Sequence, residues 1–70
     1  MKIEEIEEWA KKAIDWWSSV CMDVCVEGVN ADQVYADKDA CSDTVGDWLY
    51  DQGLEPNNIE LVKAVVLSRI

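Results

Sequence analysis

The chain has 70 residues, half of them hydrophobic, and its fifteen acidic and six basic residues give a formal net charge of −9. A chain of this length forms one small domain, here residues 1–70, which buries only about 60% of the surface that its unfolded form exposes. Its hydrophobic content, which includes four tryptophans, is too high for a disordered tail.

The acidic charge is concentrated in the middle of the chain. Residues 23–55 carry nine acids and only Lys38 as a base, whereas residues 56–70 carry one acid and two bases. Such a field repels nucleic acid and anionic membrane surfaces and attracts basic surfaces. We therefore expect no direct binding of nucleic acid, no membrane association, and a basic protein as the partner. The N-terminal sequence, MKIEEIEEW, lacks the features of a secretory signal, so a cytoplasmic protein is expected.

The first predicted element is a long helix over residues 2–26. Apolar residues recur at alternating steps of three and four from Ile3 to Val24, which is the pattern of an amphipathic helix. The first turns are rich in glutamate, which is favourable at the positive end of the helix dipole. Gly28 follows as a stop signal.

A second helix is predicted over residues 31–52, because Asn30 followed by Gln33 resembles a capping box. On a helical wheel the apolar residues of this segment fall within an arc of about 100°, and its aspartates occupy the other side. The arc keeps its phase throughout, which favours a continuous or mildly kinked helix. A break near residues 39–42, with a serine or aspartate as the new cap, is the alternative.

The end of this second helix has its own signal. Gly53 suits the left-handed conformation of a C-terminal cap, and Leu54 can then fold back onto Leu49. This pattern predicts a Schellman-type closure.

A third helix is predicted over residues 57–69, where Asn57 and Glu60 form a second capping-box pattern. Apolar residues cover nearly its whole circumference, which is typical of a helix that is central in the fold or shared between subunits. Many of them are β-branched, so a strand over residues 61–67 is the competing interpretation.

Together these elements predict an all-α fold, a compact three-helix bundle in which the third helix packs against both others. The predicted core contains the residues on the apolar arcs of the three helices: Ile6, Ala10, Ala13, Trp17, Val20, Val34, Cys41, Val45, Trp48, Leu49, Ile59, Val62 and Val66.

The other two tryptophans, Trp9 and Trp16, lie at the edge of the first apolar stripe. Core packing is the preferred interpretation, and the seam of a homodimer is the second, because tryptophan often anchors interfaces.

The chain contains no histidine, and thus lacks the usual general base near neutral pH and the commonest nitrogen ligand of metals. A zinc site built from Cys21, Cys25 and Cys41 would still need a fourth ligand. We therefore expect no enzyme, no metal and no other cofactor. The three cysteines are interpreted as reduced, small apolar side chains.

The most informative pattern is a repeat of aspartates. Asp39, Asp43, Asp47 and Asp51 lie four residues apart, and Glu55 follows at the same step. On a helix, four residues advance about 6 Å and rotate about 40°, so these side chains form a slowly winding row. Like charges at this spacing repel, and aspartate is a poor helix former. A surface chosen only for solubility usually mixes both signs of charge.

The row therefore predicts a binding surface for a basic groove, with a solvated acidic face as the alternative. Two tyrosines fall near the edge of this side of the wheel and would add ring contacts. The predicted partner-binding residues are Asp32, Tyr35, Asp39, Asp43, Asp47, Tyr50, Asp51 and Glu55.

In its size, its charge and the row over residues 39–55, the chain resembles small acidic phage-encoded inhibitors, including anti-CRISPR proteins and other DNA mimics. The resemblance implies that the acidic surface occupies the nucleic-acid-binding groove of a host defence complex, whose arginines and lysines otherwise hold DNA. The predicted function is thus that of a non-enzymatic inhibitor. The alternative is a helical adaptor or homodimerisation module whose acidic face only confers solubility.

Overall fold

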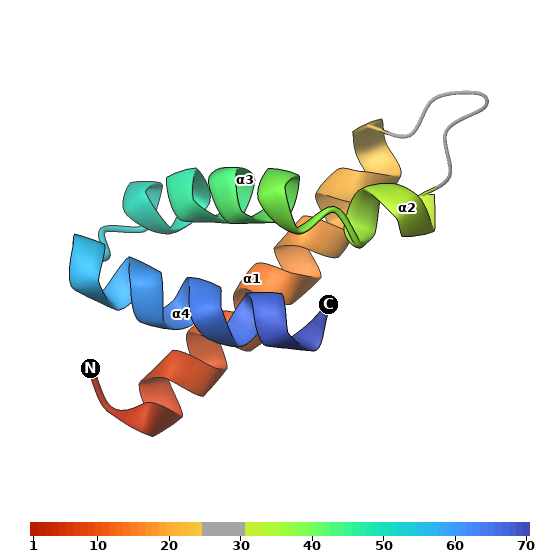
Figure 1. The fold of residues 1–70 in the computed structure, drawn as a ribbon. Helices are drawn as coiled ribbons and strands as arrows, with labels where there is room; N and C mark the ends of the chain where they lie inside the picture. Colours follow the sequence, from red (N-terminus) through yellow and green to blue (C-terminus); the bar gives the residue numbers. More distant parts are fainter. Residues whose placement is uncertain (25–30) are drawn as a thin grey trace.

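The described part of the chain in the computed structural model contains four helices and no strand (Figure 1). The structure describes residues 1–24 and 31–70, and for residues 23, 24, 31 and 32 the description covers the backbone alone. The helices are α1 (Ile3–Val24), α2 (Ala31–Tyr35), α3 (Lys38–Asp51) and α4 (Pro56–Arg69). The all-α class is confirmed, and the competing strand over residues 61–67 is excluded because these residues belong to α4.

The antiparallel helices α3 and α4 lie side by side, and α1 crosses both of them (Figure 1). Helix α4 therefore packs against α1 and α3, as its nearly all-round apolar sequence predicts. The short helix α2 packs on α1 near the start of α3. The predicted end of the first helix at residue 26, its stop at Gly28 and the Asn30 cap lie outside the described residues.

Residues 31–52 do not form one continuous helix, so the described part of the chain has four helices where three were predicted. Helix α2 ends at Tyr35, and Asp37 has an extended backbone, with φ −75° and ψ 98°. The Asp37 carboxylate accepts a hydrogen bond from the Ala40 N–H at 3.1 Å, which caps α3. This local bond competes with continuation of the helix through Asp37. The break thus lies just before the predicted range of 39–42.

Replacing Asp37 with alanine should lower the free energy of unfolding by about 1 kcal/mol, because the Ala40 N–H loses its cap. Asp37→Asn removes the same charge but keeps an oxygen acceptor, so it should remain close to wild type. Urea unfolding followed by circular dichroism measures both effects. Equal midpoints for the two variants would show that the cap contributes nothing.

The predicted closure at the end of α3 is confirmed. Gly53 has a φ of 91°, and its N–H donates to the Tyr50 carbonyl at 3.0 Å. The Leu54 N–H donates to the Leu49 carbonyl at 3.3 Å, and both leucine side chains are buried. These are the two hydrogen bonds and the hydrophobic contact of a Schellman motif.

The start of α4 differs from the prediction. The helix begins at Pro56, and Glu55 occupies the N-cap position without a side-chain hydrogen bond to the backbone. Proline is favoured at the first helical position because its φ is already close to the helical value. A backbone N–H at this position would have no partner within the helix, so proline loses no hydrogen bond there. The predicted capping box of Asn57 and Glu60 is therefore wrong, since Asn57 already lies inside the helix.

The core lies where α1, α3 and α4 meet. Most of the predicted core is buried, but Ile6, Val20, Val34 and Trp48 are only partly buried and pack against its outside. Cys21 and Leu54 are buried in addition to the predicted set. The buried hydrophobic residues are Ala10, Ala13, Trp17, Cys21, Cys41, Val45, Leu49, Leu54, Ile59, Val62 and Val66.

Candidate functional site

The aspartates of α3 lie on the side of this helix that faces away from the core. The buried residues Cys41, Val45 and Leu49 recur every four residues, and each aspartate is two residues from one of them. Two residues of helix rotate about 200°, so the two stripes lie on opposite sides and wind together. Asp39, Asp43, Asp47 and Asp51 are all exposed, and we call these four residues the acidic row.

The carboxylates of the acidic row have no salt-bridge partner within the described part of the chain. The two salt bridges found there join Lys63 to Glu60 at 3.6 Å and Arg69 to Glu7 at 3.8 Å. The second of these pairs links α4 to α1. Neither pair uses a side chain of the acidic row, so its charge is directed at solvent.

Helix dipoles explain only part of this negative surface. Asp39 lies in the first turn of α3 and Glu55 is the N-cap of α4, and negative charge is favourable at both positions. Asp43 and Asp47 lie inside α3, where aspartate is a poor helix former, and Asp51 lies at the unfavourable negative end. Asp43, Asp47 and Asp51 therefore lower the stability of α3, and the structure shows no contact of these side chains among the described residues that would offset the loss.

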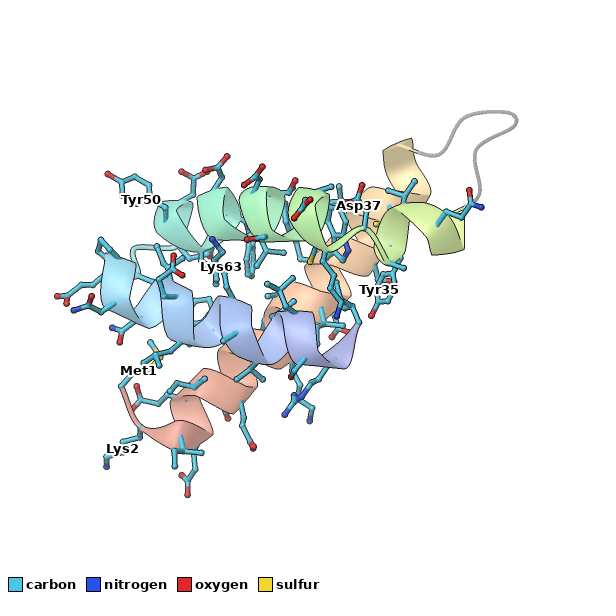
Figure 2. All side chains as sticks on the ribbon, viewed as in Figure 1. Met1, Lys2, Tyr35, Asp37, Tyr50 and Lys63 are labelled. Carbon is cyan, nitrogen blue, oxygen red and sulfur yellow. The ribbon has the colours of Figure 1, made fainter. Side chains whose placement is uncertain are left out.

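The remaining predicted site residues divide between the two ends of the α2–α3 segment. Tyr50 is 68% exposed and lies at the far end of α3, whereas Tyr35 is the last residue of α2 (Figure 2). Tyr35 is partly buried against the core, and its carbonyl accepts a hydrogen bond from Trp17 Nε1 at 3.1 Å. The structure therefore places Tyr50 but not Tyr35 beside the acidic row. The side chain of Asp32 lies outside the described residues.

An open groove of about 390 Å³ runs between α3 and α4, and it includes two members of the acidic row. From α3 the groove is also lined by three residues that are spaced four apart, Ser42, Gly46 and Tyr50. The groove could not be predicted from the pattern of α3 alone, because α4 supplies its other wall. The lining residues are Ser42, Asp43, Gly46, Asp47, Tyr50, Pro56, Asn57, Ile59, Glu60 and Lys63.

Lys63 is the basic residue among those that line this groove. Its side chain projects from α4 toward α3 (Figure 2) and is only 19% exposed. A Cβ atom added to Gly46 would lie 3.4 Å from both the Cδ and the Nζ of Lys63. Gly46 and the end of the Lys63 side chain are therefore close neighbours across the two helices. A small residue between Ser42 and Tyr50 was the sequence signal that could have indicated this close approach of two helices.

Comparison with known protein families, curated proteins and solved structures finds no match for this chain. In the part of the chain that the structure describes, no helix is long and apolar enough to cross a membrane. Among those same residues, no three acidic or cysteine side chains converge as metal ligands would.

Three of the four tryptophans form one cluster between α1 and α3. Trp48 stacks on Trp16, with ring centroids 5.1 Å apart, and meets the edge of Trp9 at 6.2 Å. The Lys12 ammonium lies 4.9 Å from the centroid of the Trp9 ring, within cation–π distance. All three rings are partly buried. Trp9 and Trp16 therefore pack within the chain. Trp48, which was predicted to belong to the core, is only partly buried and packs against it.

The cysteine side chains that the structure describes are buried. Cys21 of α1 and Cys41 of α3 both belong to the core, and Cys25 lies outside the described residues. Burial, and secondarily the charge of neighbouring Cys21, raises the pKa of Cys41 from 9.0 to about 11. Because the thiolate is the reactive and metal-binding form, Cys41 is an inert thiol near neutral pH.

Proposed function

We propose that this chain is a non-enzymatic inhibitor that binds a basic, nucleic-acid-binding surface of another protein. The observation that supports this function is the acidic row, which is exposed, unpaired among the described residues and costly to the helix that carries it. A nucleic-acid strand presents the same kind of surface, a winding and regular series of negative charges. The row then occupies the site that DNA or RNA would take, and the resemblance to phage-type DNA mimics suggests a bacterial defence complex as the target.

Electrostatic complementarity would supply both the rate and part of the affinity of this interaction. With a net charge of −9, the chain is attracted to a basic groove over long distances, and salt weakens this attraction. Each carboxylate that meets an arginine or lysine in a partly desolvated contact contributes roughly 1–3 kcal/mol. Asp43 and Asp47 lie at the centre of the row, where contacts of this kind are best shielded from solvent.

The test is capture of partners from a bacterial lysate by the wild-type protein and by the double variant Asp43→Asn, Asp47→Asn. A matched control, Glu8→Gln with Asp15→Asn, removes two exposed charges from α1. We expect the row variant to bind its partner at least about 30-fold more weakly, and the control to stay within about threefold. DNA should displace the captured wild-type protein. Unchanged capture by the row variant, or a partner without nucleic-acid function, would contradict the proposal.

A second candidate function is that of a helical adaptor or homodimer. It is favoured by Leu61 on the outer side of α4, which is 47% exposed, and by the neighbouring exposed Ala64. Unpartnered apolar side chains on a helix are typical of a surface that pairs with another helix. Sedimentation equilibrium tests this candidate. A dimer that Leu61→Glu dissociates would support it, and a strict monomer at high concentration would remove it.

A further inference from the structure

The groove between α3 and α4 is lined by apolar and by charged residues. Buried Ile59 and Gly46 belong to this lining, and exposed Asp43 and Asp47 line it from the α3 side. Tyr50, at the end of α3, is the aromatic residue among those that line the groove. Its volume, about 390 Å³, lies at the lower end of the range of ligand-binding pockets.

The groove already holds one cation that belongs to the chain itself. The Lys63 ammonium lies over Gly46 and 3.6 Å from the nearer Glu60 oxygen. The lining residues contain three carboxylates, those of Asp43, Asp47 and Glu60, against this single ammonium, which leaves a net charge of −2. The site therefore stabilises positive charge and has capacity for more of it.

We propose that this groove receives an arginine side chain of the basic partner. This inference rests on the proposed function and names the contact at its centre. The aliphatic stem of arginine would lie against the apolar part of the lining, and its guanidinium would donate to the carboxylates of Asp43 and Asp47. The guanidinium face can also lie on the Tyr50 ring, an interaction that suits arginine better than lysine.

Other occupants fit the groove less well. An anionic ligand such as a phosphate meets the same net negative charge that attracts arginine. A metal ion needs several ligands around one point, and the described carboxylates do not converge in that way. A second copy of the chain would bring together two molecules that each carry a charge of −9.

The experiment uses the complete chain and two probes of equal charge, a tetra-arginine peptide and a tetra-lysine peptide. Titration of the isotope-labelled protein, followed by backbone amide chemical shifts, gives both affinity and location. We expect the arginine peptide to bind roughly three- to tenfold more tightly than the lysine peptide. The largest shifts should lie at Gly46, Asp47 and Asn57, which line the groove.

Two pairs of variants separate the groove from a diffuse acidic surface. Asp47→Asn should weaken arginine-peptide binding by about tenfold, whereas Asp51→Asn, an equal change outside the groove, should weaken it less than about threefold. Lys63→Gln should strengthen binding because the resident cation is removed. Lys38→Gln, the same change at the exposed start of α3, should strengthen it less. Circular dichroism verifies that each variant is folded.

Equal affinity for the two peptides, equal losses in Asp47→Asn and Asp51→Asn, or no binding at millimolar peptide would overturn the inference. These results are independent of the lysate experiment. If a basic partner is captured but all row aspartates matter equally, the proposed function stands and the arginine site fails. If the arginine peptide binds the groove but no nucleic-acid-binding partner is captured, the site stands and the proposed function fails.

Discussion

Replacing Trp17 with alanine should destabilise the fold by about 3–5 kcal/mol, the usual cost of removing a buried aromatic side chain. Trp17 is only 3% exposed and lies on α1, within the core. It also donates its Nε1–H to the carbonyl of Tyr35 at 3.1 Å, which ties the end of α2 to α1. A domain of this size rarely has more than about 3–5 kcal/mol from a single core, so most molecules should be unfolded at 25 °C.

A second variant, Trp17→Phe, separates the two contributions of this side chain. It keeps most of the apolar volume but leaves the Tyr35 carbonyl without its donor, at a cost of about 1–3 kcal/mol. Urea unfolding followed by circular dichroism should show that the free energy of unfolding decreases from wild type to Trp17→Phe to Trp17→Ala. If Trp17→Ala unfolds cooperatively with a free energy of unfolding within about 1 kcal/mol of the wild-type value, Trp17 does not stabilise the core as expected.

Leu49→Ala should lower the free energy of unfolding by about 2–5 kcal/mol, because Leu49 is completely buried and its removal leaves a cavity. The same side chain makes the hydrophobic contact with Leu54 that accompanies the closure of α3. Loss of this contact should loosen both the end of α3 and the turn into α4.

Leu61→Ala is the matched control, since it makes the same chemical change in a helix at a position that is 47% exposed. Its cost should stay below about 1 kcal/mol. Thermal and urea unfolding of the two variants measure the difference. Similar losses of stability would show that burial is not what distinguishes these two leucines.

Variants of the core and of the acidic row should separate folding from binding. Leu49 belongs to the buried stripe that directs the row toward solvent, so Leu49→Ala should lose partner binding together with helical structure. The double variant at Asp43 and Asp47 should keep the helical structure. Asparagine has a similar helix propensity to aspartate, and the change removes like-charge repulsion four residues apart, so stability should stay the same or rise. Loss of binding without loss of stability is the expected signature of a binding surface.

The features that depend on local rules could be predicted from the amino-acid pattern. Apolar spacing determined the helical class and most of the core, and Gly53 determined the closure of α3, because only glycine adopts a φ of 91° without strain. The exposure of the acidic row also followed from spacing alone, since a residue two positions from a buried one lies on the opposite side of a helix. The cap positions did not follow. Asp37 and Pro56 compete with neighbouring signals of similar strength, and a difference of about 1 kcal/mol decides between them.

Only the tertiary structure decided which helices meet and what lies between them. The groove needs α3 and α4 side by side, and only their packing brings Lys63 of α4 close to Gly46 of α3. The stack of Trp48 on Trp16 likewise joins residues far apart in the chain. Periodicity determines which face of a helix is apolar. It does not determine which partner that face meets, because many arrangements bury similar apolar area and the choice depends on side-chain packing across all the helices together.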